Sequence, residues 1–319
     1  MNKVLIAGGG GFIGNHLVKY LKEMGTWVRA ADLKKPEFSK SIADEFLIGD
    51  LRDPNFVSKC FDSGIDTVFQ MAADMGGFLF IFSGQNDADI AHNSALINLN
   101  IAKQSVNSKI KKLFFSSSAC AYSQDFQTST DHHGLKESQA IPANPDSVYG
   151  WEKLFSEFMY DSFRRNYGLN IRIARFHNIF GINGTIDGGR QKAPADICRQ
   201  AAMAKDGDSI FLVGDGEQTR SFLYIDECVE GIMRLMDSDY FKPVNIGSDE
   251  MVSINQLARM VIEISGKNLK IEYMDSFQGV RGRSSDNTLI YSHLGWKPTK
   301  KLYDGLIKTY NWINQTINK

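Results

Sequence analysis

The chain has 319 residues, of which 43% are hydrophobic and 23% charged, values that are ordinary for a globular protein. Its 36 basic and 37 acidic residues give a formal net charge of −1, which gives no support for a nucleic acid or an acidic membrane as partner. No apolar run approaches the roughly 18 residues of a membrane span, and the N-terminal one is too short for a signal peptide. The four cysteines show neither CxxC pairing nor metal-ligand spacing, which predicts reduced thiols in a cytoplasmic protein without a bound metal.

Apolar runs alternate with amphipathic stretches along the first half of the chain. The predicted strands cover residues 3–8, 27–32, 46–50, 66–72, 112–117 and 171–176. The predicted helices cover residues 13–24, 89–107 and 150–166. Because the strands are continuously apolar and alternate with helices, the predicted fold class is α/β, a Rossmann-type doubly wound parallel sheet with both faces covered.

The first predicted strand runs into the glycine-rich turn "GGGGFIG", which has GxxGxxG spacing and opens a helix. Glycines let such a turn close and bring backbone N–H groups to a pyrophosphate at the helix N-terminus. Asp32 ends the second strand, where a carboxylate accepts hydrogen bonds from ribose hydroxyls and disfavours a 2′-phosphate, so NAD is predicted over NADP. Asp50 is a further candidate, either for the adenine or as a plain turn residue. The residues expected to contact the dinucleotide are Gly8, Gly11, Phe12, Ile13, Gly14, Asp32, Asp50, Tyr149 and Lys153.

The stretch "YGWEK" supplies Tyr149 and Lys153, which share one face of a predicted helix. A tyrosine hydroxyl ordinarily has a pKa of about 10, and a nearby ammonium and a positive nicotinamide ring are expected to lower it. Ser118, at the strand end in "FFSSSACAY", is the candidate to hydrogen-bond a substrate hydroxyl. With the dinucleotide turn, these residues predict a hydride-transfer site.

Further motifs are similar to those of nucleotide-sugar enzymes in the extended short-chain dehydrogenase/reductase superfamily. They are "AADMGG" (72–77), "SSAC" (117–120), "RFHNIFG" (175–181), "GGRQKAP" (188–194), "GDGEQTRSFLYIDECVEG" (214–231), "VNIGSDEMVS" (244–253) and "GVRGRSSDN" (279–287). Through them the chain resembles the family of GDP-mannose 3,5-epimerases over nearly its whole length. The resemblance implies redox-neutral epimerisation of GDP-mannose at C3 and C5, to GDP-L-galactose and/or GDP-L-gulose, through a transient 4-keto sugar on bound NAD.

The resemblance also implies two proton-transfer groups beyond Tyr149, with Cys120 as the base and Lys192 as the acid. Taken alone, Cys120 is equally well interpreted as a small buried apolar residue, and Lys192 as a solvated lysine before a helix whose first turn contains Pro194. The substrate-binding residues implied by the family motifs are Gly77, Ser118, Ala119, Cys120, Asn178, Gln191, Lys192, Ala193, Gln218, Thr219, Arg220 and Arg283.

Other polar residues near these motifs have distinct predicted roles. Arg220 and Arg283 are expected to clamp the diphosphate, because guanidinium groups match phosphate geometry. His177 is expected to be a hydrogen-bonded structural residue. His132 and His133 are adjacent and lack partners at ligand spacing, so we expect a plain loop there and no metal site.

One segment of the chain leaves the exact substrate open. Residues 75–87 depart most from the family pattern and lie beside the expected sugar pocket. The alternatives are an epimerase that acts on a related GDP-4-keto sugar, epimerisation at one carbon only, an epimerase-reductase, and a catalytically silent NAD-binding protein. A GDP-mannose 4,6-dehydratase would need a carboxylate where Ala119 and Cys120 stand.

Two domains are expected, with the site in the crevice between them. Residues 1–176 with about 221–250 would bind NAD. Residues of about 177–220 with 251–319 would form a smaller mixed C-terminal domain for the nucleotide sugar, including amphipathic helices at 253–266, capped by Ser253, and at 302–317. The superfamily resemblance implies a homodimer formed through a pair of helices.

Overall fold

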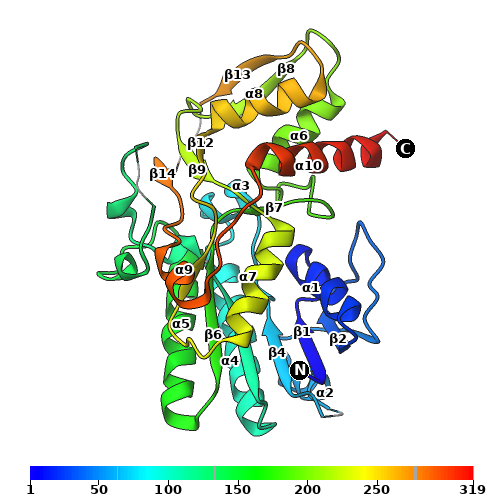
Figure 1. Cartoon of the computed structure of the whole chain (residues 1–319), viewed down its shortest axis with the longest axis vertical. Coiled ribbons are helices and arrows are strands. Elements are labelled where there is room, and N and C mark those ends of the chain that lie inside the picture. The colour runs from blue at the N-terminus through cyan, green and yellow to red at the C-terminus, as the bar shows by residue number, and fades with distance from the viewer. Residues whose placement is uncertain (63, 132–133, 276–278, 319) are drawn as a thin grey trace.

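The computed structural model describes residues 1–62, 64–131, 134–275 and 279–318. Seven parallel strands form a central sheet in the order β11-β6-β5-β4-β1-β2-β3 (Figure 1). These strands are β1 (Lys3–Ala7), β2 (Trp27–Asp32), β3 (Glu45–Ile48), β4 (Thr67–Gln70), β5 (Lys112–Ser118), β6 (Ile171–Phe176) and β11 (Val244–Ile246). All six strands predicted from the first half of the sequence are in this sheet, and the predicted fold class is confirmed.

The strand order reverses beside β1. The chain runs from β1 outward through β2 and β3, then crosses back to β4 and continues outward through β5, β6 and β11. Loops that leave neighbouring strands in opposite directions open a crevice at the carboxyl end of the sheet, where ligands bind in open α/β folds.

Two layers of helices cover the sheet. They are α1 (Phe12–Glu23), α2 (Pro54–Cys60), α4 (Asp87–Asn107), α5 (Val148–Tyr167) and α7 (Ile225–Asp237). Along β1, Val4 and Ile6 belong to the core cluster shared with α1 and α7, whereas Leu5 and Ala7 belong to the cluster shared with α2, α4 and α5. Successive side chains of a strand point to opposite faces, so a strand covered on both sides must be apolar throughout.

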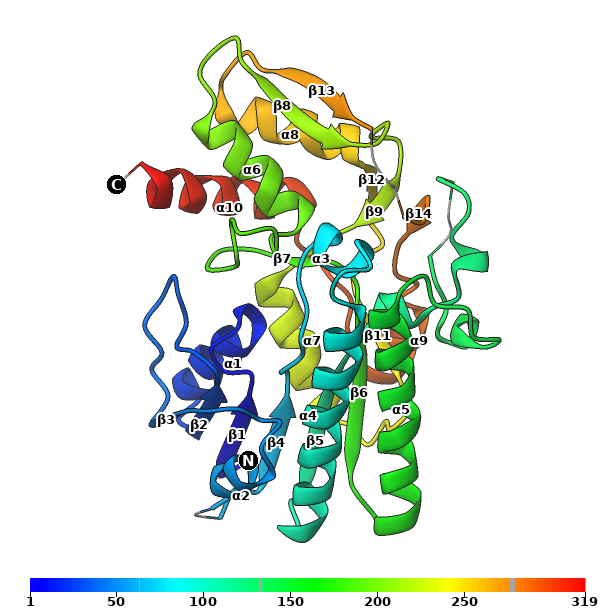
Figure 2. The same cartoon turned by 180° about the vertical axis from the view of Figure 1, so that it is seen from behind.

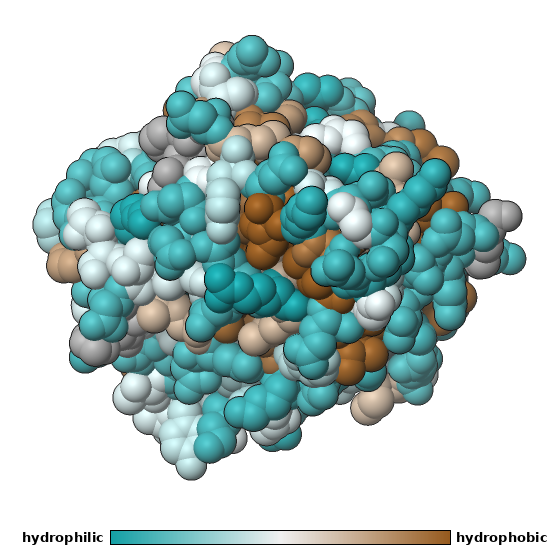
Figure 3. Space-filling model, turned by 90° about the horizontal axis from the view of Figure 1, so that it is seen from above, coloured by the Kyte–Doolittle hydropathy of each residue, from teal (hydrophilic) through white to brown (hydrophobic). Residues whose placement is uncertain are grey.

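A second group of elements gathers beyond the carboxyl end of the sheet, where Figures 1 and 2 show α6, α8 and α10 with β8 and β13. The members of this group are α3 (Phe78–Phe82), β7 (Ile179–Phe180), α6 (Ala193–Met203), β8 (Ser209–Val213), β9 (Thr219–Ser221), β10 (Leu223–Tyr224), β12 (Met251–Ser253), α8 (Ile254–Ser265), β13 (Lys270–Met274), β14 (Gly282–Arg283) and α10 (Leu302–Ile317). Helix α9 (Thr288–Leu294) lies beside β11 instead. Seen from above, the molecule is mostly hydrophilic, with hydrophobic side chains gathered in a hollow (Figure 3).

The predicted cap of α8 is confirmed. The Ser253 hydroxyl accepts from the Gln256 backbone N–H at 3.1 Å, and the Gln256 side chain accepts from the Ser253 N–H at 2.8 Å. This reciprocal pair satisfies two N–H groups that a helix start leaves without partners. Among the elements that were not predicted is α3, a short helix formed by the apolar letters "FLFIF" in the divergent segment 75–87.

None of the helices in the described ranges has the length and hydrophobicity to cross a bilayer. All four cysteines are free thiols, and only Cys120 is not fully buried. The described residues contain no group of His, Cys, Asp and Glu side chains that could hold a metal ion. His132 and His133 lie outside the described residues.

A buried ion pair fastens α5 to the sheet. The Arg175 guanidinium, on β6, donates to both carboxylate oxygens of Glu157 at 2.9 and 2.7 Å, and both side chains are 5% exposed. The Ser117 hydroxyl, on β5, donates to the same carboxylate at 2.5 Å. One carboxylate therefore ties α5 to two neighbouring strands close to the carboxyl end of the sheet.

Replacing this carboxylate should destabilise the protein strongly. We expect Glu157→Gln to lower the free energy of unfolding by about 3 kcal/mol, because it leaves the Arg175 charge buried without a counter-charge. Urea denaturation followed by circular dichroism measures the change. Glu230→Gln is the control, because its 3.3 Å pair with Arg234 is exposed, and about 0.3–0.5 kcal/mol is expected there. Equal effects of the two changes would contradict this role for Glu157.

Candidate active site

The turn between β1 and α1 is closed so tightly that side chains cannot enter it. Gly8 has a φ of +87°, a conformation that L side chains rarely adopt. A Cβ on Gly14 would lie 2.1 Å from the Gly8 carbonyl oxygen. Gly11 precedes α1 and provides no side-chain cap, so the first N–H groups of the helix face the turn, as a pyrophosphate site requires.

Asp32 lies at the carboxyl end of β2 and points back to this turn. Its carboxylate accepts from the Gly10 N–H at 2.9 Å, and burial raises its pKa. The glycine turn and this carboxylate together fit a dinucleotide with its pyrophosphate on α1 and a ribose on Asp32. Asp50 instead pairs with Arg52 at 2.6 Å in a surface turn. Phe12 and Ile13 begin α1 and are partly buried against the core.

The structure brings Ser118, Tyr149 and Lys153 together where α5 begins beside the end of β5. The Ser118 hydroxyl accepts from the Cys120 N–H at 3.1 Å and is hydrogen-bonded to the Tyr149 side chain. The Lys153 ammonium donates to the Ser116 carbonyl at 3.1 Å and lies 5.5 Å from the centre of the Tyr149 ring. The predicted hydride-transfer residues are therefore one contiguous group.

Burial dominates the ionisation of this group. Tyr149 packs with Ile81 and Ile90, and Phe82 and Cys120 lie against the same cluster. This apolar enclosure raises the pKa of the Tyr149 hydroxyl and lowers that of Lys153. The expected lowering of the tyrosine pKa by Lys153 is therefore not produced by the protein groups alone, because removing water disfavours both charged forms.

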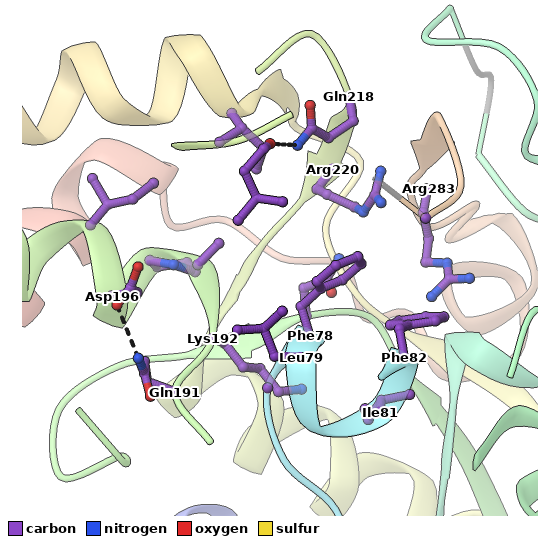
Figure 4. A pocket seen from close by; sticks show the side chains of 18 of the residues that line it. Phe78, Leu79, Ile81, Phe82, Gln191, Lys192, Asp196, Gln218, Arg220 and Arg283 are labelled. Carbon is purple, nitrogen blue, oxygen red and sulfur yellow. Dashed lines mark hydrogen bonds between the residues drawn. The ribbon is translucent and has the colours of Figure 1, made fainter. Parts of the chain in front are cut away.

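A cavity of about 270 Å³ lies on the other side of Cys120 and α3. It is walled by α3, the segment before α6, and strands β8, β9 and β14, as Figure 4 shows. The predicted substrate residues that line it are Gly77, Cys120, Asn178, Gln191, Lys192, Ala193, Gln218, Arg220 and Arg283. Within the described chain, Ser118, Ala119 and Thr219 are not on its lining, and the Thr219 hydroxyl donates to the Thr130 carbonyl at 2.8 Å instead.

Lys192 and Cys120 line the same cavity. Lys192 stands immediately before α6, whose first turn contains Pro194 as predicted. The lysine is exposed to the cavity, yet the enclosing walls remove water from its ammonium and lower its pKa, while Cys120 opposes this. An ammonium with a lowered pKa and a partly exposed thiol are groups able to exchange protons with a bound molecule.

The two candidate phosphate clamps have different surroundings. The Arg220 guanidinium donates to the carbonyl oxygens of Thr219 and Val280 at 2.7 and 2.8 Å. Burial, aided by Arg283, lowers its pKa to about 9, and no carboxylate of the described chain lies within ion-pair distance of it. A partly buried guanidinium of this kind suits an anionic ligand. Arg283 already has a carboxylate partner, Asp146, at 2.7 Å.

The segment that carries Lys192 interlocks with α3. A Cβ on Gly77 would lie 2.2 Å from the Gln191 carbonyl oxygen, so only glycine allows the two backbones to meet. The Arg190 guanidinium lies 4.0 Å from the centre of the Phe80 ring and donates to the Met75 carbonyl at 3.0 Å. This contact between distant segments closes one side of the cavity.

Several neighbouring polar residues are held by the protein itself. His177 is fully buried and hydrogen-bonded to Asn245 at 2.9 Å, as predicted for a structural residue. Asn178 has a φ of +44° and donates to the Ser221 carbonyl at 2.9 Å, and Gln218 donates to the Val213 carbonyl at 3.0 Å (Figure 4). Sequence reasoning missed Asp146, because a carboxylate just before a helix is usually a cap.

Comparison with known proteins shows to which family the chain belongs. Residues 4–247 match the model of the NAD dependent epimerase/dehydratase family. The chain is 46% identical over 319 residues to a GDP-mannose 3,5-epimerase of Arabidopsis thaliana, covering 99% of this chain and 83% of that protein. The chain belongs to this epimerase/dehydratase family. A second plant relative, GDP-mannose 3,5-epimerase 1 of Oryza sativa subsp. japonica, is 45% identical over 321 residues.

Solved structures of nucleotide-sugar enzymes share the fold. The UDP-glucose 4-epimerase of Thermotoga maritima, solved with UDP-glucose, has a TM-score of 0.87 and 25% identity, covering 99% of both chains. The UDP-glucose 4-epimerase of Thermus thermophilus, solved with NAD, has a TM-score of 0.84 and 21% identity over 98% of both chains. As a member of the family, the protein is an NAD-dependent isomerase that acts on a nucleotide sugar.

Removing the Asp32 carboxylate should weaken NAD binding. We expect Asp32→Ala to lower the affinity about tenfold, because charge-assisted hydrogen bonds to the ribose are lost. Isothermal titration with NAD, after stripping bound nucleotide, measures the effect. Glu37→Gln is the control, because this carboxylate pairs with the exposed Lys34 in the same region. An unchanged affinity in Asp32→Ala would remove this residue from the cofactor site.

Proposed function

We propose that the protein epimerises GDP-mannose at C3 and C5, to GDP-L-galactose and/or GDP-L-gulose, through a transient 4-keto sugar. The observation that carries this proposal is the shared cavity of Cys120 and Lys192, directly beside the buried group of Ser118, Tyr149 and Lys153. The 46% identity to a GDP-mannose 3,5-epimerase supports the choice of sugar.

The first group serves an oxidation at C4. NAD, held by the turn at Gly8 to Gly14 and by Asp32, would supply a reversible hydride acceptor. Tyr149 takes the proton of the C4 hydroxyl, and Ser118, its hydrogen-bond partner, positions that hydroxyl. Lys153 places a positive charge near Tyr149, because its ammonium lies 5.5 Å from the centre of the tyrosine ring. A positive charge favours the phenolate form of the tyrosine.

The second group serves proton exchange. A ketone at C4 makes the protons on C3 and C5 acidic, because the electron pair left behind is delocalised into the carbonyl. Cys120 accepts such a proton on one face of the sugar, and Lys192 returns one on the other. A hydride returned to C4 would then leave no net oxidation.

The rest of the cavity would hold the nucleotide. Arg220 is partly buried and has no carboxylate partner in the described chain, and we propose that it binds the diphosphate. We propose residues 1–176 with about 221–250 as the NAD-binding domain, because β11 joins the central sheet beside β6 and α7 packs on α1. About 177–220 with 251–319 would be the sugar-nucleotide domain. Because α3 belongs to the segment that departs most from the family pattern and lines the cavity, epimerisation of a related GDP-4-keto sugar at C3 and/or C5 is a second candidate.

The test is incubation of the purified protein with GDP-mannose in D₂O without added cofactor. Deuterium at C3 or C5 of GDP-hexose isomers, followed by NMR and mass spectrometry, is the expected result. Bound NAD with no label would direct attention to other nucleotide sugars and count against GDP-mannose.

Cys120→Ala should separate the two stages. We expect solvent exchange at C3 and C5 to fall at least about 100-fold, because the proton acceptor is lost, while transient NADH absorbance at 340 nm remains. Cys60→Ala is the control, because Cys60 is buried far from the cavity. Normal exchange in Cys120→Ala would exclude this thiol as the base, and full activity of Tyr149→Phe would exclude that hydroxyl from the oxidation.

We further propose a homodimer that works in the cytoplasm. Trp151, Phe155 and Phe158 form a stripe on α5 and are 48, 51 and 57% exposed, and Leu99, on the adjacent helix α4, is 39% exposed. A large apolar stripe on the surface of two adjacent helices marks a contact with another protein chain. The free cysteines support a reducing compartment.

A charge within this stripe should prevent dimer formation. We expect Phe158→Glu to halve the mass measured by light scattering, because burying an unpaired carboxylate costs more than the stripe contributes. Met203→Glu is the control, since Met203 is 59% exposed on α6. A wild-type monomer, or a Phe158→Glu dimer, would contradict the proposed interface.

A further inference from the structure

The guanidinium of Arg283 is held on three sides by side chains from three other segments. Its Nε donates to the Gln127 side-chain oxygen at 2.5 Å, and one terminal nitrogen donates to the Asp146 carboxylate at 2.7 Å. The other terminal nitrogen donates to the Cys120 Sγ at 3.2 Å. Arg283 lies on β14, Asp146 just before α5, and Cys120 in the 3-10 turn after β5.

The ion pair at the centre of this contact is buried. The Arg283 and Asp146 side chains are 7% and 5% exposed. The planar fork of a guanidinium fixes its orientation once two of its edges are bonded. Asp146 and Gln127 occupy two edges, so the third edge can point only at the sulfur. Asp146, Arg283 and Cys120 all line the cavity.

We infer that Asp146 is a positioning residue for proton transfer at Cys120, acting through Arg283. The inference rests on the proposed function. The step it supports moves one proton from the carbon beside the C4 ketone to Sγ and leaves its electron pair in the enolate, so no additional oxidant or reductant is needed. With Asp146 in place, the Arg283 nitrogen holds Sγ at a fixed point and places a positive charge beside it. Without that carboxylate, the guanidinium is free to turn away from the sulfur.

The same geometry separates Asp146 from the oxidation stage. Tyr149 and Lys153 contact Ser118 and the Ser116 carbonyl, and neither makes a hydrogen bond to Asp146 or Arg283 among those described. The Asp146 carboxylate is also bonded by the Ser147 hydroxyl at 3.3 Å, but the cap of α5 is Ser147 itself, which accepts from the Gly150 N–H at 3.2 Å. A change at Asp146 therefore leaves the helix start and the hydride-transfer group in place.

The experiment compares the two stages in Asp146→Asn, with the full-length protein carrying its NAD and GDP-mannose as the probe. We expect deuterium incorporation from D₂O to fall about tenfold or more, because a misplaced acceptor slows proton transfer. The single-turnover rate of NADH formation at 340 nm should stay within about threefold of wild type. Asp215→Asn is the matched control. Asp215 pairs at 3.1 Å with Arg281, which lies two residues before Arg283 in the sequence, and this ion pair is exposed to solvent.

A second measurement needs no turnover. Iodoacetamide alkylation of Cys120, followed by mass spectrometry at fixed pH, reports the surroundings of Sγ, since the other three cysteines are buried. We expect the alkylation rate to change in Asp146→Asn and to return towards wild type in Asp146→Glu, which restores the charge. Alkylation should be unchanged in Asp215→Asn.

Three results would overturn the inference. Unchanged exchange and alkylation in Asp146→Asn would assign the carboxylate no role. An equal loss of NADH formation and exchange in that variant, or the loss of its bound NAD, would assign the carboxylate a purely structural role. If Asp146→Asn does not fold, Asp146→Ala carries the test, and wild-type exchange and alkylation there would also overturn the inference, because the guanidinium would then hold the sulfur without a carboxylate partner. Absence of exchange in the wild-type protein would instead reject the proposed function.

Discussion

The close contact between the start of α5 and the carboxyl end of β5 is the constraint on which the rest of the site depends. A Cβ on Gly150 would lie 2.1 Å from the Cys120 carbonyl oxygen, so the helix can rest on this turn only with glycine at that position. Tyr149 and Lys153 flank Gly150 on the same helix, and Ser118 and Cys120 flank the same strand end. One backbone contact thus sets the distances among all four side chains.

Buried charges keep this contact in place. Glu157 holds α5 to β5 and β6 by accepting from Ser117 and Arg175, one helical turn beyond Lys153. Lys153 itself reaches the Ser116 carbonyl. Each of these charges is costly to bury alone and is stabilised only when its partner is in register. A shift of α5 along the sheet would break several of these pairs at once, and this makes the position of Tyr149 definite.

The cavity is closed by segments that are distant in sequence. The Lys192 segment meets α3 where Gln191 approaches Gly77, and Arg190 stacks on Phe80. Arg283 comes from β14 to contact Cys120 and Asp146. Because these segments meet at the carboxyl end of the central sheet, the cavity unites groups for proton transfer with the partly buried Arg220, which suits an anion. This combination is what a nucleotide sugar undergoing epimerisation requires.

Much of the fold and part of the site followed from local patterns. Continuous apolar runs predicted the parallel strands, because a strand buried on both faces has no polar side to show. The turn at Gly8 to Gly14, the Tyr149–Lys153 spacing and the Ser253 cap were readable because each depends on neighbours within a few residues. The resemblance to a known family, rather than any spacing, pointed to Cys120 and Lys192.

Contacts between distant segments were decided only by the tertiary structure. The sequence by itself determined the doubly wound sheet, the dinucleotide turn and the chemical groups available to the site. It could not show that burial raises the pKa of Tyr149, that "FLFIF" folds as α3 over the site, or that Asp146 pairs with Arg283 rather than capping a helix. Desolvation and ion pairing depend on the distances in space between groups that are far apart in the sequence. Spacing along the chain does not predict those distances.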